Sequence, residues 1–161
     1  MMKILMKWLA PVIFKLTFLL YRAALFKNSR RKHQWVMRLF RFAADNDSCQ
    51  ALSVYGHLLH FRGEGKDNRI QGAIYLQRAA EKGDMKAQYQ MGKIYESGFE
   101  HYFSASDEKS LSYYQQAAAQ GHALAISRLL KVYQSGELGQ AINEKEAERW
   151  QLRQPTLSVS Q

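Results

Sequence analysis

The chain contains a repeated segment, and this repeat constrains its fold more than any other feature. Residues 79–83 return 38 positions later as residues 117–121, with the same pair of alanines and the same final glycine. Residues 94–98 return at the same distance as residues 132–136, and Ala43-Ala44 precede the first alanine pair by 36 positions. A period of 36 to 38 residues is typical of an array of helical hairpins.

Each unit predicts two amphipathic helices. The first is indicated by residues at the helical positions i, i+4, i+7 and i+8, namely Ala87, Met91, Ile94 and Tyr95. The second has its apolar side at Leu111, Tyr114, Ala117 and Ala118. Either Ser106 or Asp107 can cap its start, and Gly121 can end it. One such hairpin is too small to bury its apolar side alone, so the sequence predicts an all-α fold, an α/α solenoid of stacked antiparallel helix hairpins with about three to four repeats.

The pattern resembles the Sel-one-like repeat, a relative of the tetratricopeptide repeat. Residues that match the first helix of the family's unit are Ala87, Met91, Gly92, Tyr95 and Gly98, and then Ala125, Leu129, Tyr133 and Gly136. Residues that match its second helix are Tyr75, Ala79, Ala80 and Gly83, then Tyr113, Tyr114, Ala117, Ala118 and Gly121, and finally Ala147 and Trp150. The resemblance runs from about residue 43 to residue 150. It implies a non-enzymatic adaptor for protein complexes, frequently at bacterial envelopes, with no catalyst among its repeat residues.

The loop that follows Gly98 departs from the family pattern, because it is longer and lacks the second glycine. It carries four ring-bearing side chains, which are costly in solvent unless they dock on something: Phe99, His101, Tyr102 and Phe103. We expect them either to bind a protein partner or to fold back on the repeat. A groove for a partner is expected along polar positions of the first helices, namely His57, Gln90, Lys93, Arg128 and Lys131.

The positive charge is confined to the N-terminal quarter. The whole chain has 23 Lys and Arg against 14 Asp and Glu, a formal net charge of +9. Residues 1–44 contain ten of the basic residues and no acidic one, whereas residues 45–161 are nearly neutral. The basic character therefore belongs to one end of the chain and not to the repeats.

The N-terminal residues predict a basic amphipathic helix that Pro11 interrupts. Lys3, Lys7, Lys15 and Arg22 fall within an arc of about 120°, and the other side carries Trp8, Val12, Leu16, Leu19 and Leu20. We favour a helix that lies in the membrane interface, with its lysines at headgroup level. The basic run that follows would add attraction to an anionic leaflet. The residues expected to contact the membrane are Lys3, Lys7, Trp8, Phe14, Lys15, Phe18, Arg22, Arg30, Arg31 and Lys32.

Other interpretations of this helix stay open. Lys15 breaks the apolar run that a transmembrane span needs, and residues 21–23 make a poor cleavage site for a secretory signal. The apolar side could instead pack on the first repeat as an N-terminal cap. The helix could also belong to a degenerate repeat. Ile13 and Phe18 argue against this alternative, because they occupy positions at which the repeat has small residues. We expect the repeats on the cytoplasmic face of the inner membrane, or in the periplasm behind an uncleaved anchor or signal.

The sequence predicts no catalysis, metal site or cofactor. Cys49 is the only cysteine and is expected as a buried thiol near the start of a helix. His57 and His60 lie three positions apart, but no further metal-ligand pattern accompanies them. Phosphate-binding and serine-nucleophile motifs do not occur in the sequence.

Basic and aromatic residues alternate between positions 30 and 42, a pattern that could bind single-stranded nucleic acid. We favour the simpler interpretation, in which two arginines form a solvated rim and three larger side chains enter the solenoid core. The two arginines are Arg38 and Arg41, and the three core residues are Trp35, Leu39 and Phe42.

We therefore divide the chain into an N-terminal helix and linker (residues 1–32), a solenoid (residues 33–152) and a flexible tail (residues 153–161). The predicted function is a protein-protein interaction scaffold associated with the bacterial inner membrane. The alternative is a structural subunit of a larger envelope or membrane machine. Expected partners are proteins and either a membrane surface or membrane-protein helices; nucleic acid is disfavoured, and no small-molecule substrate is expected.

Overall fold

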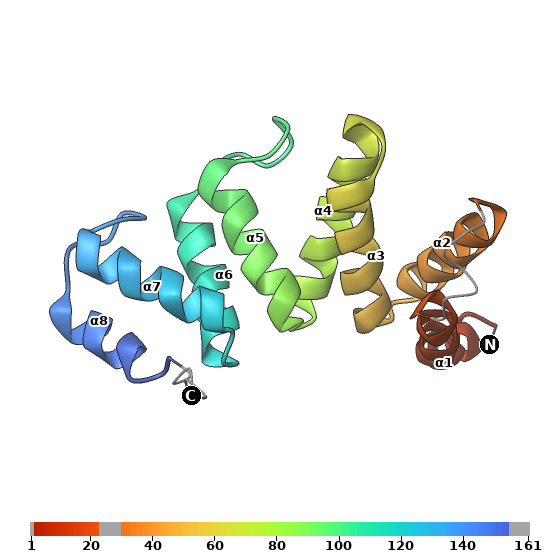
Figure 1. The fold of residues 1–161 in the computed structure, drawn as a ribbon, viewed down its shortest axis with the longest axis horizontal. Coiled ribbons are helices and arrows are strands. Elements are labelled where there is room, and N and C mark those ends of the chain that lie inside the picture. Colours follow the sequence, from red (N-terminus) through yellow and green to blue (C-terminus); the bar gives the residue numbers. More distant parts are fainter. Residues whose placement is uncertain (1, 23–29, 155–161) are drawn as a thin grey trace, which may run out of the picture. The chain divides into compact units, whose positions relative to one another are not determined.

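The computed structural model describes residues 2–22 and 30–154, without the side chains of residues 2–5, 7, 22 and 30–33. These residues form eight helices (Figure 1): α1 (Met2–Arg22), α2 (Arg30–Asp45), α3 (Cys49–Arg62), α4 (Gly65–Glu81), α5 (Met85–Ser97), α6 (Asp107–Ala119), α7 (Ala123–Ser135) and α8 (Glu144–Gln151). Consecutive helices pair as hairpins, α1 with α2, α3 with α4, α5 with α6 and α7 with α8. The predicted all-α solenoid of stacked hairpins is confirmed.

The chain divides into two compact units. Unit 1 spans Met1–Asp84 and contains α1 to α4, and unit 2 spans Met85–Gln161 and contains α5 to α8. Within unit 1, α2 also packs on α3, and within unit 2, α6 packs on α7, so that hairpins share a core inside each unit.

Short polar side chains and an imidazole cap the starts of four repeat helices. Each accepts a hydrogen bond from the backbone N–H three residues later, which satisfies one of the unpaired donors of a helix start. These caps are Ser48 for α3, Ser106 for α6, His122 for α7 and Asn143 for α8. Of the two residues that the sequence offered for α6, Ser106 is the cap and Asp107 is the first helical residue. Gly136 ends α7 in the left-handed conformation, with a φ of 70°.

Glycines allow the two helices of a hairpin to approach closely. A Cβ atom at Gly92 on α5 would lie 2.7 Å from the ring of Tyr114 on α6. The Ser110 hydroxyl of α6 donates a hydrogen bond to the Gly92 carbonyl at 2.9 Å, a contact that needs the same short separation. In unit 1, a Cβ at Gly72 of α4 would overlap the backbone of His60 on α3. Glycines therefore allow close approach of paired helices in both units.

The core of unit 2 consists of residues that carry the family resemblance, together with Ile126. Its buried members are Tyr114, Ala117, Ala118, Ala125, Ile126, Leu129, Tyr133, Ala147 and Trp150. In unit 1, the corresponding buried positions of α3 and α4 include Ala51, Leu52, Tyr55, Ala73, Leu76, Ala79 and Ala80. The apolar positions predicted from the period of the repeat thus form the interior.

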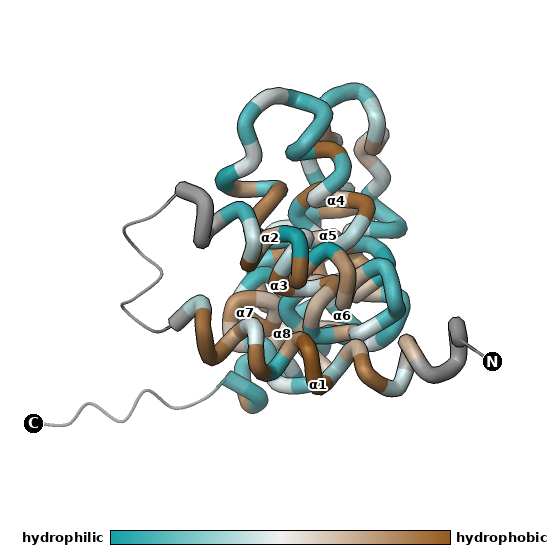
Figure 2. The backbone as a smooth tube through the Cα atoms, turned by 90° about the vertical axis from the view of Figure 1, so that its right-hand side faces the viewer, coloured by the Kyte–Doolittle hydropathy of each residue, from teal (hydrophilic) through white to brown (hydrophobic). Residues whose placement is uncertain are grey.

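The first helix is continuous where a break was expected. Pro11 was expected to interrupt it, but α1 continues from Met2 to Arg22 without a break. Proline removes one hydrogen-bond donor from a helix and clashes with the preceding turn, which kinks or weakens a helix but need not end it. Figure 2 shows hydrophobic stretches along much of α1. At the other end, α8 finishes at Gln151, and most of the predicted tail lies outside the described residues.

Candidate interaction surfaces

Helix α1 packs on its neighbour through a narrow side of small and aromatic residues. Ala10, Phe14 and Thr17 are buried. The ring of Phe14 lies 5.7 Å from the ring of Phe40 on α2, and Tyr21 contacts the same ring at 5.7 Å. Burial of one phenylalanine side chain contributes about 1.5–3 kcal/mol. This contact therefore helps to hold α1 on α2.

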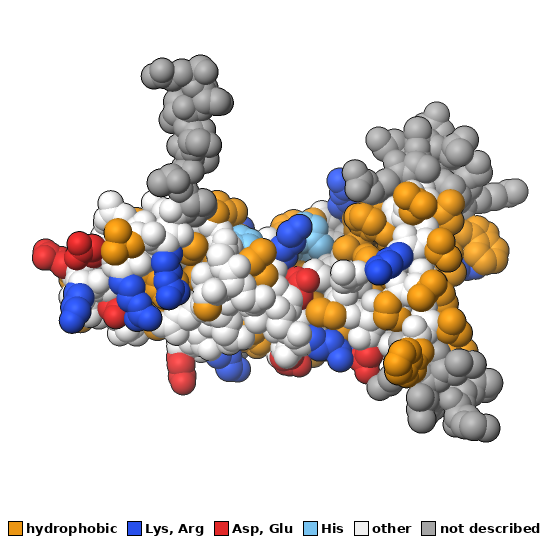
Figure 3. Space-filling model, turned by 90° about the horizontal axis from the view of Figure 1, so that it is seen from below, with side chains coloured by type: hydrophobic (Ala, Val, Ile, Leu, Met, Phe, Trp, Pro, Cys, Tyr) orange, Lys and Arg blue, Asp and Glu red, His pale blue; other side chains and the backbone are white. Residues whose placement is uncertain are grey.

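The opposite side of α1 is apolar and exposed. We call it the α1 apolar stripe, and it consists of Trp8, Leu9, Val12, Leu16, Leu19 and Leu20. Trp8 is 78% exposed and Leu16 is 59% exposed. Figure 3 shows hydrophobic side chains gathered along the N-terminal part of unit 1. A soluble protein rarely leaves a continuous apolar strip of this kind uncovered, so the stripe is a candidate contact surface.

These positions correct two expectations about the N-terminal helix. The cap interpretation expected the stripe to pack on the first repeat, but α1 uses its other side. Phe14 and Phe18 were expected in the acyl boundary, but Phe14 is buried and stacks with Phe18 at 5.6 Å. The physical reason is the ring of Phe40, which gives Phe14 an apolar partner within unit 1.

Lys15 is the one basic residue of the predicted membrane set whose side chain the structure describes. It is exposed, and helical spacing of 100° per residue places it at the edge of the stripe, beside Trp8 and Leu19. The side chains of the other basic members, Lys3, Lys7, Arg22, Arg30, Arg31 and Lys32, lie outside the described residues. In the part of the chain that the structure describes, no helix is both long and apolar enough to cross a membrane.

Helix α2 also presents an aromatic side chain to solvent. Trp35 is 63% exposed, Leu39 is exposed as well, and the guanidinium of Arg38 lies 5.7 Å from the centre of the Trp35 ring. The expectation that Trp35 and Leu39 enter the core is therefore wrong. The buried residues of α2 are instead Val36, Phe40, Ala43 and Ala44. Val36 and Phe40 directly follow Trp35 and Leu39 in the sequence. Arg38 and Arg41 are exposed, as expected for a rim.

The aromatic loop after α5 folds as a tight turn. The backbone N–H of Phe99 donates to the carbonyl of Phe103 at 2.8 Å, and the N–H of Tyr102 donates to the carbonyl of Phe99 at 3.0 Å. Both central residues of the turn have positive φ, 51° for Glu100 and 59° for His101. A residue other than glycine pays about 1–3 kcal/mol in this region, and such strain is more common at functional sites.

The four loop residues that the sequence singled out have different environments. Phe103 is 5% exposed and packs edge-on against Tyr95 at 5.8 Å, so it folds back on the repeat and cannot meet a partner in this conformation. Phe99 is half-buried. His101 and Tyr102 face solvent, and Tyr102 is 58% exposed. The loop therefore combines both expectations: Phe103 anchors it to the repeat, and His101 and Tyr102 are exposed on its surface.

The next repeat has the same turn with a different sequence. Leu138 and Gly139 have φ values of 51° and 68°, and Gln140 N–H donates to Glu137 at 3.1 Å. His101 occupies the position of Gly139, 38 residues earlier in the chain. His101 thus adopts a positive φ at the position where the second turn has glycine, the residue that adopts such a φ most readily.

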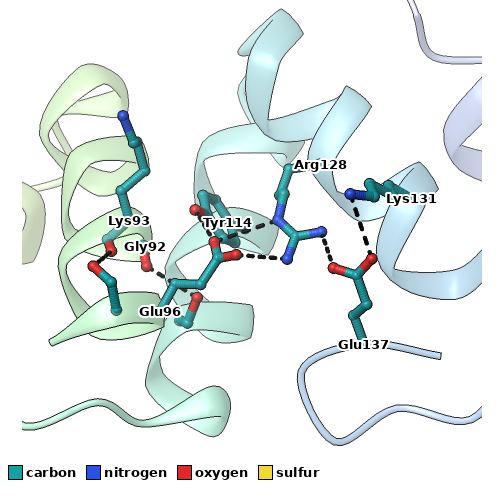
Figure 4. Close-up of polar contacts among 9 residues, drawn as sticks. Gly92, Lys93, Glu96, Tyr114, Arg128, Lys131 and Glu137 are labelled. Carbon is teal, nitrogen blue, oxygen red and sulfur yellow. Dashed lines mark hydrogen bonds and ion pairs between the residues drawn. The ribbon is translucent and has the colours of Figure 1, made fainter. Parts of the chain in front are cut away.

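The expected groove residues of unit 2 include one that is fully engaged. Figure 4 shows Arg128 between two carboxylates. Its Nη2 lies 2.6 Å from Glu96 Oε1, and its Nη1 lies 2.6 Å from Glu137 Oε2. The Tyr114 hydroxyl donates to Glu96 at 2.6 Å. Arg128 is consequently part of the internal structure of unit 2, while Lys131, 3.6 Å from Glu137, remains mostly exposed.

The carboxylates of this cluster are stabilised as anions. Burial alone would raise the pKa of Glu96, but hydrogen bonds from Arg128 and Tyr114 outweigh it and lower the pKa. The hydrogen bond from Arg128 likewise lowers the pKa of Glu137.

Lys93 is exposed, and Figure 4 shows its side chain pointing away from the cluster. Gln90 is half-buried.

In unit 1, the predicted groove residue His57 is exposed and stands beside an aromatic side chain. Its ring centre lies 4.4 Å from that of Phe61, and His60 contacts the same ring at 4.7 Å. Sequence reasoning missed Phe61, although its position four residues after His57 places both on one side of α3. No group of three or more metal-ligating side chains occurs among the described residues.

Cys49 is the first residue of α3 and is half-buried. Its thiol lies 4.0 Å from the carbonyl of Ala79, and burial raises its pKa, with a smaller contribution from Asp84. A raised thiol pKa leaves less thiolate at neutral pH, so the residue has the character of a packing side chain.

Comparisons with known proteins agree with this geometry. Residues 49–84 and 86–122 match the family described as Sel1 repeat. A crystal structure of a Sel1 repeat protein from Oxalobacter formigenes superposes with a TM-score of 0.71 at 26% identity, covering 88% of this chain and 56% of that chain. A protective antigen of uropathogenic Escherichia coli, whose structure displays an SLR fold, gives a TM-score of 0.64 at 24% identity over 73% of this chain and 25% of its own.

A curated relative also shares part of its sequence with the chain. Chitin synthase regulatory factor 3 of Schizosaccharomyces pombe is 30% identical over 120 residues, which is 71% of this chain and 13% of that protein. The chain thus spans a small part of this relative and about half of the Oxalobacter structure.

Proposed function

The chain is a Sel1-like repeat protein, and we propose that it is a scaffold that holds a protein partner at the surface of the inner membrane. Sel1 repeat proteins are generally protein-interaction scaffolds, and the repeats here supply the buried positions through which hairpins stack. The relative from Schizosaccharomyces pombe is named as a regulatory factor, a role that is compatible with a scaffold.

The exposed α1 apolar stripe is the observation that carries the membrane part of this proposal. The helix already has a partner in α2, so its outer side is not needed for the fold. An apolar strip with basic residues nearby is the composition of a helix that lies in a membrane interface. The ten basic residues of positions 1–44 add attraction to anionic lipids, worth about 1 kcal/mol for each residue near the surface.

The partner part of the proposal rests on the presented turn and on exposed positions of the first helices. His101 and Tyr102 project from a strained turn that Phe103 anchors. His57 with Phe61, and Lys93 with Lys131, are further exposed positions on α3, α5 and α7. Arg128 is withdrawn from the set because it is bound to Glu96 and Glu137.

A second candidate is a structural subunit of a larger membrane machine. The same stripe would then pack on membrane-protein helices and not on lipid. Such a chain would be recovered only together with its complex, whereas the scaffold we favour would bind lipid vesicles by itself.

Membrane fractionation of the native host tests the proposal. The full chain should sediment with membranes, and the double variant Leu16→Glu/Leu19→Glu should appear in the supernatant. Leu124→Glu is a matched control, because Leu124 is an equally exposed leucine (59%) at the start of α7. Equal sedimentation of the stripe variant and the full chain would argue against the membrane part.

Photo-crosslinking tests the partner part in the same host. A photo-reactive amino acid at His101 should give a discrete crosslinked protein band, identified by mass spectrometry. The band should weaken strongly when Tyr102→Ser is added, while Ser112→Ala, an exposed change on α6, should leave it unchanged. A crosslinking pattern that does not respond to Tyr102 would argue against this turn as the contact.

A further inference from the structure

We infer that the α1 apolar stripe docks on the surface of an anionic phospholipid bilayer while α1 stays packed on α2. This inference rests on the proposed function and adds to it the state of the helix when the stripe meets the lipid. The helix binds lipid as a folded part of unit 1, without leaving α2.

The first argument is the opposition of the two sides of α1. Phe14 and Tyr21 contact Phe40, whereas Val12 lies about 180° away from them on a helix with 100° per residue. A membrane can therefore reach the stripe without displacing any buried side chain. Insertion through Phe14 and Phe18 instead would break the aromatic contacts with α2.

The second argument is charge, which decides between lipid and a second copy of the chain. Residues 1–44 contain ten basic residues and no acidic one. Two copies that met stripe to stripe would bring two such segments together and repel each other. An anionic lipid surface has the charge opposite to that of this basic segment, and its acyl chains offer an apolar environment to the stripe.

The third argument is the position of Lys15. It lies at the edge of the stripe and not at its centre, and its side chain is exposed. In a helix that lies flat, such a lysine extends to the headgroups while the adjoining Trp8 and Leu19 enter the acyl boundary. In a helix that crosses the bilayer, the same lysine would stand near the middle of the apolar core.

Vesicle binding of the purified full chain is the first part of the test. We expect binding to vesicles of phosphatidylglycerol and phosphatidylcholine, and at least tenfold weaker binding to phosphatidylcholine alone. Leu16→Glu/Leu19→Glu should weaken binding at least tenfold, and Leu124→Glu should change it less than twofold. Circular dichroism checks that each variant retains its helices.

Spin labels supply the second part. In a Cys49→Ser background, a nitroxide at Leu16→Cys should become accessible to oxygen and protected from a water-soluble nickel reagent when vesicles are added. A second label at Gln71→Cys, an exposed position on α4, provides a distance to the first within unit 1. That distance distribution should be the same in solution and on vesicles.

The outcomes separate the inference from the function on which it rests. Absence of vesicle binding by the full chain would contradict both the inference and the membrane part of the function. Binding with an unprotected label at position 16, or with a changed distance to position 71, would overturn the inference and leave membrane binding standing. Binding that does not depend on anionic lipid would also overturn it. A concentration-dependent dimer that Leu16→Glu/Leu19→Glu dissolves, without lipid binding, would identify a second copy as the occupant.

Discussion

Arg128 on α7 binds Glu96 on α5 through two hydrogen bonds, from Nη2 to Oε1 at 2.6 Å and from Nε to Oε2 at 3.3 Å. The two residues are 32 positions apart and belong to adjacent repeats. Glu96 also accepts a hydrogen bond from Tyr114 of α6 at 2.6 Å. One carboxylate therefore connects three helices of unit 2.

Replacement of Arg128 by methionine should destabilise the fold. The substitution keeps an apolar stem and removes the charge, so Glu96 remains half-buried without its cation. We expect a loss of about 1–2 kcal/mol in the free energy of unfolding, between the values typical of exposed and buried ion pairs. Urea denaturation measures it. Lys131→Gln is the control, because Lys131 is mostly exposed and its replacement should lower the free energy of unfolding much less. Equal losses in the two variants would contradict the structural role of Arg128.

The close contact at Gly92 predicts a penalty for the smallest possible enlargement. A Cβ there would lie 2.7 Å from the ring of Tyr114, which is buried and whose hydroxyl is bound to Glu96. Overpacking costs about 1–3 kcal/mol, and the better helix propensity of alanine returns about 1 kcal/mol. We expect Gly92→Ala to lower the free energy of unfolding by up to about 2 kcal/mol in urea denaturation.

The same substitution in a Tyr114→Leu background identifies the cause. Most of the additional penalty should disappear, because Tyr114→Leu takes away the ring atoms with which the new Cβ would clash. An unchanged penalty for Gly92→Ala in that background would show that the ring is not what excludes the Cβ.

The aromatic loop predicts opposite behaviour of two adjacent residues. Phe103→Ser should lower the free energy of unfolding by about 2–4 kcal/mol, because it removes a buried ring from its contact with Tyr95. Tyr102→Ser should change stability by less than about 0.5 kcal/mol, because the side chain is mostly in solvent. Thermal unfolding distinguishes them. A large loss for Tyr102→Ser would mean that its ring supports the fold, and its role as a presented side chain would then fail.

The period of the repeat was sufficient to predict most of the architecture. Positions such as Ala87 and Ala125 recur because the helices of a hairpin must approach closely, and that requirement leaves a local signature in the sequence. Ser106 could also be predicted as a cap from its place before an apolar run. The limits of a helix and its inward positions are local properties, so the sequence contains them.

The environment of α1 and α2 could not be predicted in the same way. The apolar side of α1 was identified correctly, but the choice of which side packs depends on Phe40, which lies 26 residues after Phe14. Trp35 and Leu39 were wrongly expected in the core because α2 carries apolar residues on more than one side. Arg128 looked free because its partner Glu96 comes from another repeat, and no local pattern announces such a pair.

His122 predicts a pH dependence of stability in unit 2. Its Nδ1 accepts the backbone N–H of Ala125 at 3.3 Å, and its ring stacks on Tyr89 at 4.5 Å. Burial, followed by the positive charge of Lys86, lowers its pKa below the ordinary value of 6.5. The folded state therefore favours the neutral ring, and only the neutral ring can accept this hydrogen bond.

The sign of the effect follows from this shift. Below pH 6.5 the unfolded chain binds a proton that the folded chain resists, so the contribution is complete above that pH and declines as the pH falls toward the lowered pKa. We expect the decline to reach at most about 1 kcal/mol, the value of one N-cap. Asparagine caps a helix without titrating, so His122→Asn should lose less stability than the parent chain between pH 7.5 and pH 5.5 in urea denaturation. If both proteins lose the same amount over this interval, protonation of His122 is not the cause.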